Sequence, residues 1–158
     1  MKEELLELFS GVSTFGQPFT MEMLLLRICA AVVIGAAIGI DRAIKNRPAG
    51  MRTHVLVCLG AALVALIEQQ QAAIILMQGP GSPVNVSVGR ITSTVVSGVG
   101  FLGAGTIFIS EHKISGLTTA ASLWCTACIG LAVGSGFPDT ARTTISAFAF
   151  CAILNTPL

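Results

Sequence analysis

The sequence predicts an all-α membrane protein, a bundle of five transmembrane helices with its N-terminus outside and its C-terminus in the cytoplasm. Of the 158 residues, 53% are hydrophobic and 11% are charged, whereas an average soluble domain has about 25% charged residues. The mean hydropathy of +0.83 likewise indicates a membrane protein. The 17 glycines suit closely packed transmembrane helices. With a net charge of +1, this composition excludes a disordered segment, a coiled coil and a nucleic-acid-binding module.

The N-terminal part of the chain has a polar lead-in and a first apolar run. Residues 1–23 carry more acidic than basic side chains and lack the positive start of a signal peptide, so we expect a short amphipathic segment there. Residues 24–40 form the first transmembrane run. It is interrupted only by Arg27, whose side chain we expect to reach the nearby membrane interface.

The second run, residues 54–67, ends at the polar residues 68–71 and is short for a bilayer, so its helix must draw on flanking residues. Residues 72–77 are too few to span and are expected at the interface. A Pro- and Gly-rich loop follows at residues 79–83.

Three more apolar runs complete the five expected spans. Residues 91–110 and 114–138 contain no charged side chain, and the charged segment 111–113 separates them. Residues 140–154 form the last run, with Arg142 near its start. The whole of residues 24–158 is therefore expected to be one transmembrane domain without a soluble C-terminal domain.

Positive charge orients the predicted bundle. The loop 41–53 holds one acidic residue, Asp41, against four basic residues, and the loop 111–113 adds Lys113. Because cytoplasmic loops of membrane proteins carry the excess of Lys and Arg, both loops are expected in the cytoplasm.

Small residues recur at helical spacing in three of the runs. In lipid, such residues allow helix backbones to approach closely, either within one chain or between the two copies of a homodimer, and the pattern leaves both alternatives open. The expected packing residues are Gly35, Gly39, Gly98, Gly100, Gly103, Gly105, Gly130 and Gly134.

The loop 41–53 and the start of the next helix form the candidate functional or partner site. It is either a topology signal or a binding site, since its arginines favour bidentate contacts to a carboxylate or phosphate. Asp41 ends a helix, where the dipole disfavours a carboxylate, so we expect a cationic partner such as Arg42 or Arg52. A histidine in such a loop is usually solvated. The candidates here are Asp41, Arg42, Arg47, Pro48, Gly50, Arg52, Thr53 and His54, and Arg90 is added from the start of the third run.

Hydroxyl groups are frequent in the third and fourth runs. They are expected to bond to their own helix or to link helices, with the lining of a polar cavity as the alternative. Ser97, Thr118 and Thr119 are the candidates among them. Cys125 and Cys128 are expected to be small packing residues of a helix rather than a metal or redox pair. No HExxH, GxSxG or GxGD motif is present, so no catalytic, cofactor or metal site is expected.

Three motifs in this order and spacing resemble the MgtC/SapB family, over roughly residues 24–154. They are Gly39-Ile40-Asp41-Arg42 followed by residues 47–54 (Arg-Pro-Ala-Gly-Met-Arg-Thr-His), residues 96–105 (Val-Ser-Gly-Val-Gly-Phe-Leu-Gly-Ala-Gly) and residues 116–124 (Gly-Leu-Thr-Thr-Ala-Ala-Ser-Leu-Trp). The resemblance implies a bacterial inner-membrane protein with five spans. The chain departs from the family pattern at Ala43, Ser87 and Thr94, where relatives usually carry acidic residues or glutamine.

The resemblance also implies a function. It suggests a non-enzymatic regulator linked to growth at low magnesium, membrane potential and intracellular survival of pathogens, acting on a membrane-protein partner such as the F-type ATP synthase. The alternative is a magnesium transporter or a transport-associated subunit. Hydrated magnesium is usually held by carboxylates, and the acidic residues near the expected membrane edges are divided between the two faces, which favours the regulator.

Overall fold

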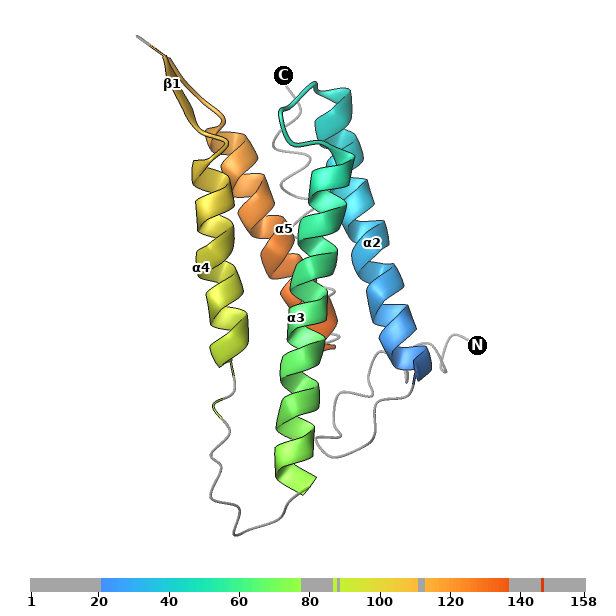
Figure 1. Cartoon of the computed structure of the whole chain (residues 1–158). Coiled ribbons are helices and arrows are strands. Elements are labelled where there is room, and N and C mark those ends of the chain that lie inside the picture. Colours follow the sequence, from blue (N-terminus) through green and yellow to red (C-terminus); the bar gives the residue numbers. More distant parts are fainter. Residues whose placement is uncertain (1–20, 78–86, 88, 111–112, 137–145, 147–158) are drawn as a thin grey trace.

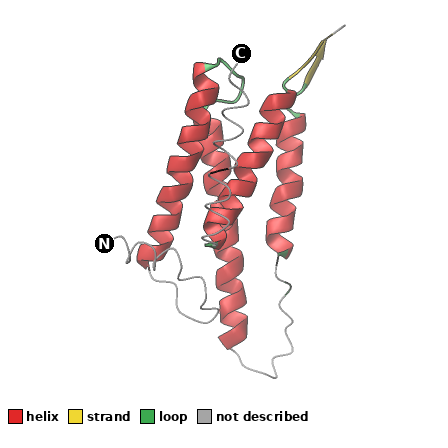
Figure 2. Ribbon diagram, turned by 180° about the vertical axis from the view of Figure 1, so that it is seen from behind, coloured by secondary structure: helices red, strands yellow, loops and turns green. Residues whose placement is uncertain are grey.

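A computed structural model describes residues 21–77, 87, 89–110, 113–136 and 146. Within this part of the chain lie four helices and one two-stranded antiparallel hairpin (Figures 1 and 2). The elements are α2 (Met21–Ile44), α3 (Met51–Met77), α4 (Arg90–Ala104), β1 (Phe108–Ser110), β2 (Lys113–Ser115) and α5 (Leu117–Ser135). The fifth expected run, residues 140–154, lies outside the described residues except for Ser146, and so do residues 1–20 of the lead-in.

Three of these helices are long and apolar enough to cross a membrane, namely Met21–Ile44, Met51–Ile75 and Leu117–Ser135. The chain is therefore a membrane protein with helical spans. The helix α4 has 15 residues, about 22 Å of helix, which is shorter than a hydrocarbon core of about 30 Å.

The helices run alternately up and down, and α3 packs against each of the other three (Figure 1). This alternation brings the α2–α3 loop and the β1–β2 hairpin to one end of the bundle, which we call the loop end. The start of α4 and the end of α5 lie toward the other end, which we call the cap end. The two loops that the sequence assigns to one side of the membrane thus share one end of the molecule.

The helix α3 corrects the prediction of a short second run. It continues without interruption for 27 residues, through the polar residues 68–71 and through residues 72–77, which were expected as a separate interface segment. Glu and Gln are good helix formers, and Glu68 and Gln69 find partners on neighbouring helices. Polar side chains satisfied in this way do not end a helix.

The third and fourth runs also differ from the prediction, because α4 ends at Ala104 and a hairpin replaces the ends of both expected spans. Thr106 closes α4 by donating its hydroxyl and its N–H to the Gly103 carbonyl at 2.8 and 3.0 Å. Ile109 then pairs with Ile114 in the hairpin. Gly116 returns the chain to α5 with φ +90°, and a Cβ there would collide with the Thr106 carbonyl, so both the backbone angle and the space require glycine.

Contacts between small residues form the core. Ala31, Cys58 and Ala62 are completely buried between α2, α3 and α5. A Cβ on Gly35 would lie 2.9 Å from the Val55 Cα, and one on Gly130 would collide with the Cys58 carbonyl. The backbones of α2 and α5 thus touch α3 on both sides, as expected of helices that pack in lipid through small residues.

This packing predicts that Gly130→Ala destabilises the protein. The added Cβ has no room against α3, and overpacking of this kind costs about 1–3 kcal/mol. Thermal unfolding of the purified protein in detergent measures the change. The matched control is Gly60→Ala, since a Cβ on Gly60 meets nothing within 4 Å. Equal stability of the two variants would contradict the tight α3–α5 contact.

Candidate functional site

At the loop end, Asp41 does have a cationic partner. The Asp41 Oδ1 atom lies 2.9 Å from the Nζ atom of Lys45, four residues along the same helix. The sequence pointed to Arg42 or Arg52, but an i,i+4 pair on one helix face needs no contact between helices. Asn46 then adopts φ +50°, and the Arg47 N–H bonds to the Arg42 carbonyl at 3.0 Å to close the end of α2.

The remaining loop candidates are largely exposed. Arg47, Pro48, Arg52 and Thr53 are exposed, and Arg42 and Gly50 are half-buried. The Gly50 carbonyl accepts the His54 N–H at 3.2 Å and lies 2.9 Å from His54 Nδ1. Gly50 therefore fixes the start of α3 and the orientation of the His54 ring.

His54 is not the solvated loop histidine expected from the sequence. Because α3 begins at Met51, His54 lies on its first turn, is 0% exposed and faces α5. Its Nδ1 atom faces a carbonyl and so carries a proton, and its Nε2 atom lies 3.1 Å from Ser122 Oγ. Ser122 Oγ is also 2.9 Å from the Thr119 carbonyl, so the single hydroxyl proton has two acceptors. This buried contact links α3 to α5.

Among the other hydroxyl candidates, Ser97 bonds within its own helix. Ser97 is exposed and donates to the Ser93 carbonyl at 3.3 Å, Thr118 is exposed, and Thr119 is buried. Ser93 and Thr94 likewise donate to carbonyl groups three residues earlier in α4. These bonds to the same helix agree with the first of the two interpretations of the hydroxyls.

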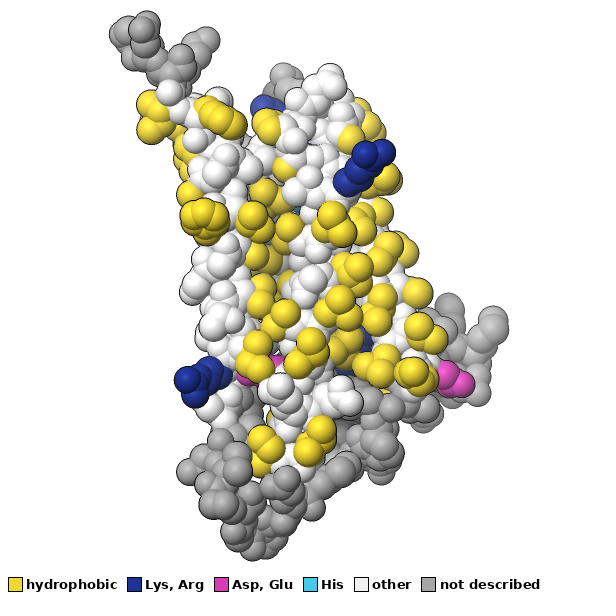
Figure 3. All heavy atoms as spheres, viewed as in Figure 1, with side chains coloured by type: hydrophobic (Ala, Val, Ile, Leu, Met, Phe, Trp, Pro, Cys, Tyr) yellow, Lys and Arg dark blue, Asp and Glu magenta, His cyan; other side chains and the backbone are white. Residues whose placement is uncertain are grey.

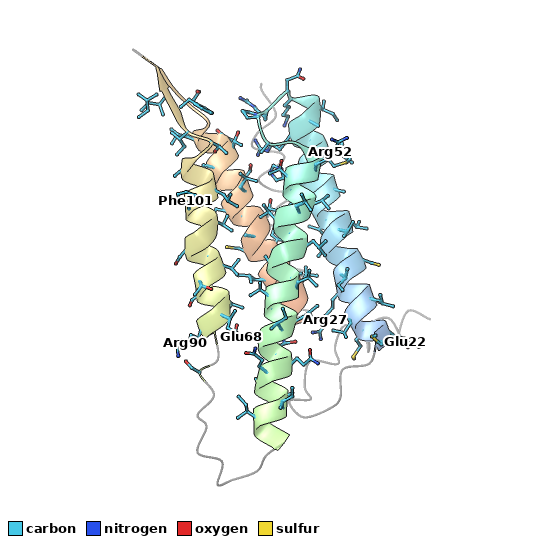
Figure 4. All side chains as sticks on the ribbon, in the orientation of Figure 1. Glu22, Arg27, Arg52, Glu68, Arg90 and Phe101 are labelled. Carbon is cyan, nitrogen blue, oxygen red and sulfur yellow. The ribbon has the colours of Figure 1, made fainter. Side chains whose placement is uncertain are left out.

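Arg90 lies at the other end of the bundle from Arg52 (Figure 4). The structure therefore does not bring Arg90 together with the loop candidates. Its place at the start of α4 is close to Glu68, and this region contains the polar groups that sequence reasoning missed.

Glu68 of α3 caps the first turn of α4. Its two carboxylate oxygens accept the backbone N–H groups of Ile91 and Thr92, each at 3.1 Å. The residue that precedes α4, Gly89, has no side chain to cap the helix, and the first N–H groups of any helix lack partners within it. Glu68, only 9% exposed, supplies these partners and places a negative charge at the positive end of the α4 dipole.

Arg27 and Gln69 act in the same way at the end of α5. Arg27 Nη1 donates to the Gly134 carbonyl at 3.0 Å and to Gln69 Oε1 at 2.9 Å, and Gln69 Nε2 donates to the Ser135 carbonyl. The guanidinium lies so close to Gly136 that any Cβ there would collide with it. The expectation that Arg27 reaches out to the interface is therefore wrong. Arg27 is 7% exposed and points into the bundle. There its positive charge interacts favourably with the negative end of the α5 dipole.

We call Arg27, Glu68 and Gln69 the cap network. Two helix ends of opposite polarity lie together, and each is matched by a side chain of the complementary kind. A signal for this exists in the sequence, because the alternation of helices places Arg27 and residues 68–71 at the same end. The network is structural in character, and among the described residues no group of three His, Cys, Asp or Glu side chains is arranged to hold a metal ion.

The cap on α4 predicts the effect of Glu68→Ala on hydrogen exchange. Loss of the carboxylate leaves the N–H groups of Ile91 and Thr92 without acceptors, and bonds to charged groups contribute about 1.5–3 kcal/mol. Exchange at these two amides should therefore accelerate by about tenfold or more, as measured by hydrogen–deuterium exchange mass spectrometry. Gln70→Ala, at the exposed neighbouring position, is the control. Unchanged protection in Glu68→Ala would show that Glu68 does not cap α4.

Comparison with known proteins agrees with the motifs. The sequence profile of the MgtC family matches residues 28–158. The chain is 43% identical over 117 residues to "Putative magnesium transporter YhiD" of Escherichia coli (strain K12), a match that covers 74% of this chain and 53% of the relative. It is 42% identical over 122 residues to "Protein MgtC" of Salmonella typhimurium (strain LT2), covering 77% and 48%, and 38% identical over 129 residues to "Protein MgtC" of Brucella abortus (strain 2308), covering 81% and 50%.

The chain thus spans about half the length of the curated relatives it matches. No solved structure shows a significant match. The profile match over most of the chain and the identity to these relatives show that this protein belongs to the MgtC family.

Proposed function

We propose that this protein is a non-enzymatic regulator in the bacterial inner membrane that acts by packing one of its helices against a membrane-protein partner. The observation that carries the proposal is a face of α4 that the described chain leaves open. Family membership and three apolar helices support the location.

The open face of α4 combines small and polar residues with two large apolar side chains, Phe101, 82% exposed, and Leu102, 52% exposed. A Cβ on Gly98 or Gly100 would meet nothing within 4 Å, in contrast to Gly35, Gly39, Gly130 and Gly134, which touch another helix. Ser93, Thr94 and Ser97 are exposed on the same helix, with their hydroxyls bonded to its own carbonyls. In Figure 3 the lower part of α4 is mostly white, whereas α2 and α3 present a largely hydrophobic surface.

The small residues of this face suit a helix better than lipid. Two helices gain dispersion energy where small residues let their backbones approach, and lipid chains pack less well against such a surface. Two more glycines were expected to pack in this region. Gly103 contacts Ala120 of α5, and Gly105 lies just beyond the last residue of α4. Among the described residues, Gly98 and Gly100 are therefore the glycines within α4 left open to a partner, on two sides of the helix because they are two positions apart.

The F-type ATP synthase is the partner that we propose, on the basis of the family resemblance, with a second copy of the chain as a further interaction. The regulation would connect growth at low magnesium to membrane potential and to survival of a pathogen inside host cells. The positive charge of the loop 41–53 supports a cytoplasmic loop end, and together with the five apolar runs of the sequence it supports an external N-terminus.

A second candidate function is cation transport. The name of one relative, "Putative magnesium transporter YhiD", favours it. Asp41 is the carboxylate at the loop end within the described residues, and it already pairs with Lys45, which is unlike the carboxylate and water shells that usually hold magnesium.

The open α4 face predicts the behaviour of a Gly98→Leu, Gly100→Leu double variant. Leucine fits the free space and is a better helix former than glycine, so folding is maintained while close approach of a partner helix is blocked. In inverted membrane vesicles, the wild-type protein should lower ATP-driven proton pumping and the double variant should not. Gly60→Leu, at an equally open position of α3, should behave as wild type.

If the double variant inhibited proton pumping as fully as the wild type, α4 would not be the contact surface.

A flux assay in proteoliposomes distinguishes cation transport, the second candidate function, from regulation. Magnesium entry that requires Asp41 would establish transport and contradict regulation as the sole function.

A further inference from the structure

We propose that the loop end is a binding site for the headgroup of an anionic phospholipid, formed by Arg47 and Arg52 together with the exposed apolar residues beside them. The inference is independent of the proposed function, because it concerns the opposite end of the bundle from the cap network and a different surface from the open face of α4.

Charge at the loop end is positive and largely exposed. Arg47 and Arg52 are both exposed. Within the described ranges the one carboxylate of this end is Asp41, which lies 2.9 Å from Lys45, so the described residues give neither arginine a carboxylate partner. An anion from outside the chain is the complementary ligand for these groups.

Exposed apolar side chains precede Arg47 on α2 and follow Arg52 on α3. Ile40, 47% exposed, and Ile44, 75% exposed, lie one turn apart on α2, and Arg47 follows three residues later. On α3, Arg52 is followed one turn later by Leu56, which is 68% exposed. Figure 4 places Arg52 near the loop end, and Figure 3 shows many hydrophobic side chains along α2 and α3, interspersed with white atoms.

This arrangement selects the chemistry of the ligand. Acyl chains cover exposed apolar side chains on a membrane helix, and the headgroup of the same lipid then reaches the arginines beside them. A free phosphate would use the arginines alone and gain nothing from Ile44 or Leu56. Lysine would satisfy the positive charge bias equally well, but the planar guanidinium can bind two oxygens of one phosphate group.

The test measures lipid retention on the purified full chain. The protein is given equimolar phosphatidylglycerol and phosphatidylcholine with identical acyl chains in detergent, and bound lipid is counted by native mass spectrometry. We expect the wild type to retain phosphatidylglycerol preferentially. A basic residue near a lipid surface is worth about a fivefold change in affinity, so the Arg47→Gln, Arg52→Gln double variant should lose about 25-fold.

Two further variants make the result specific. Arg90→Gln removes one exposed arginine from the start of α4, near the cap end, and should keep the wild-type preference. Leu56→Gln keeps both loop arginines but removes an exposed apolar side chain, and should weaken retention of phosphatidylglycerol. Circular dichroism and gel filtration verify that each exposed substitution leaves the fold intact.

Three outcomes would overturn the proposal. They are equal retention of the two lipids by the wild type, a loss in Arg90→Gln equal to that in the double variant, and full displacement of phosphatidylglycerol by millimolar inorganic phosphate. The last result would identify a site for a free anion instead of a lipid.

Discussion

Glu68 and Gln69 are neighbours on α3, yet they bond to two different helices. Glu68 accepts the first N–H groups of α4, and Gln69 bonds to the end of α5 together with Arg27 from α2. Backbone groups that lack partners are costly inside a membrane, and two helix ends meet here. The cap network therefore joins all four described helices by satisfying groups that would otherwise oppose insertion.

The packing of small residues follows from this arrangement. Because α3 carries the caps, α2 and α5 must approach it closely, and Gly35, Gly130 and Gly134 provide the space. The buried His54–Ser122 contact holds α3 to α5 near the loop end. Several polar groups of the described residues are thus used inside the chain, whereas part of α4 and the arginines of the loop end are exposed.

The sequence predicted the membrane class, the first helix and the common end of the two loops, because these follow from composition and from the alternation of charge. The motifs predicted the family, and this is confirmed. The sequence did not predict that Arg27 points inward or that α3 continues through residues 68–71, since both features depend on partners far along the chain. The hairpin at Ile109 and the burial of His54 were missed because hydropathy does not distinguish an apolar strand from a helix or show which face a residue takes.

The cap network holds the helices together, and a double-mutant cycle on Arg27 and Gln69 tests this most directly. The free energy of unfolding in detergent is measured for wild type, Arg27→Met, Gln69→Leu and the double variant. Residues that share one hydrogen-bond network show coupling energies of about 0.5–3 kcal/mol, and a favourable value in this range is expected. Strictly additive losses would contradict the account, because they would mean that Arg27 and Gln69 do not act on each other.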